Sequence, residues 1–94
     1  MTAGAPPYRA DVLAIDDTPE NLQLLSQLLT ERHYKVRSVT KGRTALRAAQ
    51  AAPPDLLLLD INMPDIGGYE VWECLKAANI TRIITVMFHS AIGQ

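Results

Sequence analysis

The segment DLLLLD at residues 55–60 decides the fold. Four consecutive leucines leave no polar face, and this pattern is typical of a strand that is covered on both sides, as strands in parallel sheets are. The run ends abruptly at Asp60, and Met63-Pro64 soon after it marks a loop. The sequence therefore predicts a central buried strand whose last residue carries a carboxylate.

Apolar runs and helical spacing alternate on both sides of this segment. Residues 11–15 form a second short apolar run, which stops at Asp16 and Asp17 and also indicates a buried strand. Thr18 can cap a helix, and Pro19 suits the first helical position. Helices are expected at about 18–32, around 45–49 and around 71–78, and further strands at 34–39 and 83–88.

The alternation of strand and helix predicts an α/β fold with an open parallel sheet in three layers, with four strands and three helices. Residues 1–10 are expected to be an irregular leader, and residues 11–94 one domain. Nine basic and ten acidic residues are mixed along the chain, so no charged field argues for nucleic acid or a membrane surface. A single cysteine and the lack of a long apolar run favour a cytoplasmic location.

Carboxylates follow two of the predicted strands, at Asp16 and Asp17 and at Asp60. If the first and third strands are neighbours, these side chains meet at the carboxyl ends of the strands. Ligands of open α/β sheets bind at that end. Their mutual repulsion favours a bound cation, and hard oxygen ligands without histidine or cysteine favour Mg²⁺. The alternative is that these acids only form turns and cap helices, which is the commoner role of one such residue but less so of three.

Three blocks of the sequence, residues 11–17, 54–64 and 68–71, resemble the receiver domains of response regulators in order and spacing. The resemblance implies a flavodoxin-like sheet with strand order 2-1-3-4. It also implies a signalling module, not an enzyme, that accepts a phosphoryl group from a histidine kinase or phosphotransfer protein in the presence of Mg²⁺.

The resemblance also implies a role for each matching residue. Asp60 matches the phosphoryl acceptor, and Asp16 and Asp17 match the acidic pair that binds Mg²⁺, with Asp17 as the direct ligand. Asn62 would contribute its backbone carbonyl to the same ion, and Ser90 matches the hydroxyl residue that hydrogen-bonds the phosphoryl group.

The chain departs from the family pattern at its end. Family members continue through a fourth helix, a fifth strand and a fifth helix, which carry a lysine that contacts the phosphoryl group and an aromatic switch residue. Lys35, Lys41 and Lys76 fall in other elements and do not replace that lysine. The chain is thus expected to be a truncated receiver.

Without a fifth strand, residues 83–89 would form an exposed edge. Unpaired backbone groups beside exposed apolar surface are expected there, from Ile83, Ile84, Val86, Met87 and Phe88. This predicts a homodimer formed through the fourth strand.

Two other functions remain open. The first is a dimerisation or protein-interaction module that works without phosphorylation. The second is a metal-dependent phosphohydrolase. This function is less favoured, because such enzymes need a second acid at the position where this chain has Asn62.

Overall fold

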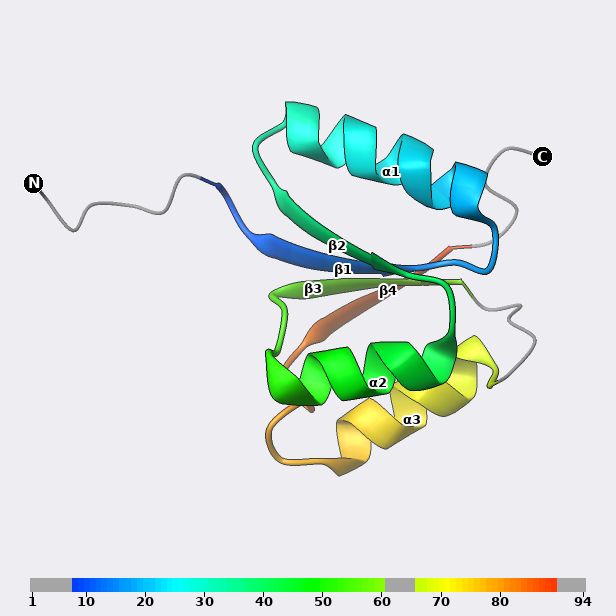
Figure 1. The fold of residues 1–94 in the computed structure, drawn as a ribbon. Coiled ribbons are helices and arrows are strands. Elements are labelled where there is room, and N and C mark those ends of the chain that lie inside the picture. Colours follow the sequence, from blue (N-terminus) through cyan, green and yellow to red (C-terminus); the bar gives the residue numbers. More distant parts are fainter. Residues whose placement is uncertain (1–7, 61–65, 90–94) are drawn as a thin grey trace, which may run out of the picture.

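The computed structural model describes residues 8–60 and 66–89 and confirms the predicted alternation of strands and helices (Figure 1). In chain order the elements are β1 (Asp11–Ile15), α1 (Pro19–Glu31), β2 (Lys35–Val39), α2 (Gly42–Ala51), β3 (Leu56–Asp60), α3 (Gly68–Ala77) and β4 (Thr85–His89). Helix α1 covers one face of the sheet, and α2 and α3 cover the other. No helix within the described residues is long and apolar enough to cross a membrane.

The four strands form one parallel sheet in the order β2-β1-β3-β4, as predicted. Strand β1 is paired on both edges: Ile15 lies opposite Val39 of β2 and opposite Leu59 of β3. Because the strands are parallel and in this register, the carboxyl ends of β1 and β3 lie side by side at the same level of the sheet.

The two faces of the sheet are buried to different degrees. Leu57 and Leu59 are fully buried among residues of α2 and α3. Leu56 and Leu58 point to the opposite face, because side chains alternate along a strand, and they are only partly buried. The predicted burial of the four-leucine run is therefore complete on one face only, since α1 packs on β2 and β1.

Gly42, the first residue of α2, has no space for a larger side chain. A Cβ atom at this position would collide with the side chain of Ile66 and lie 3.0 Å from Cγ2 of Val71. The glycine thus lets the start of α2 pack closely against the segment that leads into α3, and this contact closes the core on that face.

Strand β4 begins at Thr85, two residues later than predicted. The side chain of Lys76 donates hydrogen bonds to the carbonyls of Arg82 and Ile84, both at 2.9 Å, and the Thr81 hydroxyl donates to the Leu75 carbonyl at 2.8 Å. These bonds hold residues 81–84 as a loop against the end of α3.

The same loop alters the predicted exposed edge. Ile84 is buried at 3% exposure and Val86 is half-buried, so these two residues contribute little to the exposed apolar surface that was expected at this edge. Ile83, Met87 and Phe88 are exposed, at 84%, 54% and 38%, as predicted.

The two ends of α1 are built differently from each other. Thr18 precedes the helix as predicted, but its side chain makes no capping hydrogen bond to the backbone. At the other end, the N–H of Tyr34 donates to the Leu29 carbonyl and the N–H of His33 to the Thr30 carbonyl, both at 3.0 Å. This is a Schellman motif, and it holds His33 at a φ of 69°, where glycine is favoured.

The substitution His33→Gly should raise the free energy of unfolding by about 0.5–1 kcal/mol, because it removes the cost of a left-handed backbone at a residue with a Cβ atom. Urea unfolding followed by the fluorescence of Trp72 measures the change. The control is Arg32→Gly at the adjacent position, where φ is −100° and glycine should lower stability. The strain explanation is wrong if both variants shift stability in the same direction.

Candidate functional site

Three carboxylates meet at one end of the sheet. Asp16 and Asp17 follow β1 directly, and Asp60 is the last residue of β3. One oxygen from each side chain lies within 4.8 Å of one from each of the others. The pairing of β1 with β3 produces this arrangement, because it sets Ile15 and Leu59 opposite each other and so brings the residues that follow them together.

Asp16 is held by hydrogen bonds and is almost fully buried, with only 2% exposure. One of its side-chain oxygens accepts the backbone N–H of Thr18 at 2.8 Å, and the other accepts the side-chain amide of Asn21 at 3.2 Å. Its own N–H donates to the Val39 carbonyl of β2 at 3.2 Å. The orientation of the Asp16 carboxylate is therefore fixed by the β1–α1 turn and by the first turn of α1.

Asp17 and Asp60 differ in their access to solvent. Asp17 is exposed, and its carboxylate lies 3.4 Å from the Thr18 hydroxyl. Asp60 is 7% exposed at the end of a buried strand. The site thus combines two buried acids, Asp16 and Asp60, with one exposed acid, Asp17.

Like charges at this spacing are unfavourable without a counter-ion. Two carboxylates about 5 Å apart repel by roughly 3 kcal/mol at an effective dielectric constant of about 20. The three oxygens lie close enough together that one divalent cation could bind them and offset this repulsion. Carboxylate oxygens without histidine or cysteine are a donor set that fits a hard metal ion such as Mg²⁺.

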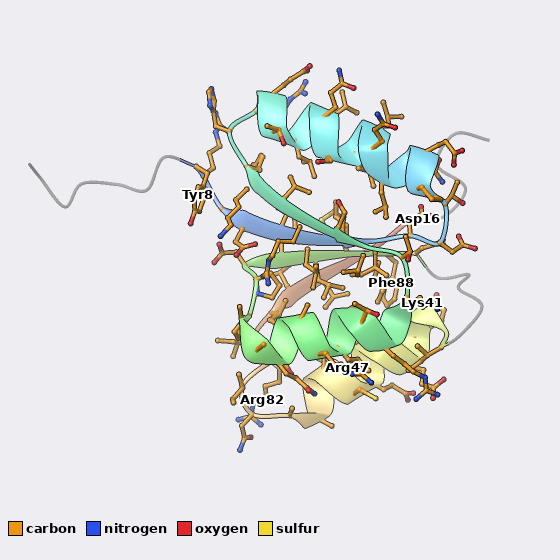
Figure 2. All side chains as sticks on the ribbon, viewed as in Figure 1. Tyr8, Asp16, Lys41, Arg47, Arg82 and Phe88 are labelled. Atoms are coloured by element: carbon orange, nitrogen blue, oxygen red, sulfur yellow. The ribbon has the colours of Figure 1, made fainter. Side chains whose placement is uncertain are left out.

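Two of the residues predicted for this site, Asn62 and Ser90, lie outside the described residues. Two of the lysines are held elsewhere: Lys76 binds the carbonyls before β4, and the Lys35 ammonium lies 5.6 Å from the centre of the Tyr8 ring. Figure 2 shows Lys41 at the same end of the sheet as Asp16, whereas Tyr8 lies at the opposite end.

An aromatic pair adjoins the acidic cluster on the β4 side. The ring centres of Tyr69, in the first turn of α3, and Phe88 of β4 are 4.8 Å apart. Phe88 lies opposite Leu59, and the next pair along the strands is Asp60 and His89. Tyr69 is 63% exposed, so the pair is a surface contact between α3 and the end of β4.

Asn21 was not identified from the sequence, although it holds the Asp16 carboxylate. Its position offers only a weak signal: an amide side chain one helical turn after an acidic pair that ends a strand. Which way that amide points depends on how α1 leaves the turn, and residue spacing does not determine this.

A family model described as the response regulator receiver domain matches residues 12–93. The response regulator PleD of Caulobacter vibrioides is 39% identical over 83 residues, which cover 88% of this chain and 18% of that protein. The chain thus spans about a fifth of the length of this relative.

Solved structures show the same fold. The N-terminal domain of a response regulator receiver protein from Methanoculleus marisnigri matches with a TM-score of 0.81 and 34% identity, covering 84% of this chain and 64% of that one. The response regulator TrrA of Thermotoga maritima, in complex with Mg²⁺ and BeF, matches with a TM-score of 0.82 and 28% identity, covering 90% of this chain and 72% of that one.

The family model covers most of the chain, the relative and the solved structures agree with it, and the strand order and the acidic cluster suit it. The chain belongs to the response regulator receiver domain family.

Proposed function

We propose that this domain accepts a phosphoryl group on Asp60 from a histidine kinase or phosphotransfer protein, with Mg²⁺ bound by the acidic cluster, in the cytoplasm. The observation that carries the proposal is the convergence of Asp16, Asp17 and Asp60 within 4.8 Å. Membership of the receiver family and a relative solved with Mg²⁺ and BeF support it.

The proposed reaction uses Asp60 as the nucleophile. A carboxylate oxygen of Asp60 bonds to phosphorus while the bond from phosphorus to the donor breaks, and the donor leaves with that electron pair. Mg²⁺ supplies positive charge that offsets the charge on the transferred group. Asp17 would bind the ion directly, with the Asn62 carbonyl, while Asp16 would be held in place by Thr18 and Asn21. Ser90 would hydrogen-bond the phosphorylated product.

The wild-type domain incubated with acetyl phosphate and Mg²⁺ should gain the mass of one phosphoryl group, because Asp60 is the nucleophile. Intact mass spectrometry measures this, and Asp60→Asn should abolish the gain. The matched control is Asp55→Asn, the same change at the other end of β3, where the amide oxygen can still accept the Asp11 N–H. If Asp60→Asn gained as much phosphoryl mass as Asp55→Asn, the acceptor would be a residue other than Asp60.

Asp17→Asn should weaken Mg²⁺ binding about tenfold, or roughly 1.4 kcal/mol, because a neutral amide oxygen replaces a charged ligand. Isothermal titration with MgCl₂ measures the affinity. Glu20→Gln serves as the control, because it removes an exposed charge from the first turn of α1 outside the cluster. Unchanged affinity in Asp17→Asn, or an equal loss in the control, would contradict the role proposed for Asp17.

We propose as a second function that β4 is a surface for self-association. Among the described residues β4 is an edge strand, so one side of its backbone has no neighbouring strand. The exposed side chains of Met87 and Phe88 lie on β4, and that of Ile83 lies in the loop just before it. Pairing two copies of β4 about a two-fold axis would satisfy the backbone and cover part of this apolar surface.

A dimer is therefore expected at high micromolar concentration, and sedimentation analysis measures its size. Met87→Glu should shift the protein to monomer by placing a charge in the apolar interface. Leu24→Glu, a matched change at a 46% exposed leucine on α1, should leave the dimer intact. A monomeric wild-type domain would contradict the proposal, and dissociation caused only by Leu24→Glu would move the interface to α1.

A further inference from the structure

A groove of about 750 Å³ runs between α1 and the outer side of β2. It is separate from the β4 edge, because β2 and β4 are the two opposite edges of the sheet. The lining residues come from one flank of α1 and from the end of β2: Pro19, Leu22, Gln23, Ser26, Gln27, Thr30, Glu31, Ser38 and Thr40.

The backbone of β2 can add a further strand beside this groove. In a parallel pair, successive residues direct their backbone groups alternately to one side and to the other. The Lys35 N–H donates to Ala10 and the Val39 carbonyl accepts from Asp16, so these two residues face β1. Val36 and Ser38 therefore direct their N–H and C=O groups outward, and no strand lies there among the residues that the structure describes.

The lining is almost without charge, and most of its exposed surface is carbon, although many of its side chains carry a hydroxyl or amide group. Four uncharged residues recur on one flank of α1 at helical spacing: Gln23, Ser26, Gln27 and Thr30. Ser38 of β2 and Thr40, just after the strand, complete the lining. Glu31 is the one charged residue in the lining, and no lysine, arginine or histidine contributes to it. The groove therefore suits uncharged side chains with a basic group near Glu31, and it does not suit phosphate or another anion.

The basic residues of β2 leave this edge open. The Arg37 side chain bonds to the Asp11 carboxylate at 3.2 Å and to the Ala52 carbonyl at 2.7 Å, on the face that α2 covers. The Lys35 ammonium is 5.6 Å from the centre of the Tyr8 ring, near the start of β1. Neither charge lies in the groove, although charges on an edge strand often block further pairing.

We propose that this groove binds an extended peptide segment of a partner protein, which adds to the sheet as a strand beside β2. Its backbone bonds to Val36 and Ser38, and every second side chain enters the groove beneath α1. The segment carries uncharged side chains, such as those of Thr or Gln, at these alternate positions and one basic residue that reaches Glu31. This surface is distinct from the acidic cluster, so the proposal does not depend on phosphorylation of Asp60.

The probes are an array of short acetylated peptides with Ser, Thr, Asn or Gln at alternate positions, each ending in Arg or, as its pair, in Glu. Titration into the isotopically labelled full chain is followed by NMR. We expect amide shifts at Val36 and Ser38 and along α1, and binding of the Arg peptides at least fivefold tighter than that of their Glu pairs. The proposal fails if no peptide shifts these amides, or if the Glu peptides bind equally well.

Two variants test the geometry. Ser38→Pro removes an outward N–H without touching the pairing with β1, and it should weaken binding at least tenfold. Gln27→Lys places a cation in the groove and should also weaken peptide binding at least tenfold. Gln50→Lys, the same change at an exposed position of α2, should leave peptide binding unchanged.

If circular dichroism shows that Ser38→Pro is unfolded, the comparison of Gln27→Lys with Gln50→Lys decides, and equal affinities overturn the proposal. A dimer that Ser38→Pro dissociates while peptides fail to bind would assign this edge to a second copy of the chain instead.

Discussion

The parallel pairing of β1 with β3 is the constraint on which the rest of the structure depends. It places the residues that follow Ile15 and Leu59 at one level of the sheet and thereby brings three carboxylates together. Their repulsion, about 3 kcal/mol for a pair, opposes the pairing. Val12, Leu13 and Ile15 of β1 are fully buried, and burial of such a side chain contributes about 1.5–3 kcal/mol each. Burial of this strand therefore offsets repulsion of the same order, and the fold can hold an acidic site.

Most of the fold could be predicted from the sequence because the apolar runs are short, are bounded by polar or turn-forming residues, and alternate with helical spacing. The start of β4 could not be predicted in this way. Ile83 and Ile84 look like strand residues, but the side chains of Lys76 and Thr81 bind the backbone of α3 and of the following loop. Those bonds join residues on two elements, and local spacing carries no information about them.

The acids of the site could be predicted for the same reason as the strands, since each stands where an apolar run ends. The side chains that surround these acids could not be predicted. The hydrogen bond from Asn21 to Asp16 depends on the path of the β1–α1 turn, and the contact of Tyr69 with Phe88 depends on how α3 lies against β4. Sequence reasoning identifies side chains by type and position along the chain, whereas these contacts are set by the angles between elements.

The central position of β1 also bears on how the chain acquires its structure during synthesis. Although β1 emerges early, one of its two neighbours is β3, and Asp11 and Asp55 bond to each other across a separation of 44 residues. Contacts that distant in sequence form slowly, because the intervening loop must first be closed. Until β3 leaves the ribosome, one edge of an almost wholly apolar strand stays unpaired on the nascent chain, where chaperones or unwanted partners can reach it.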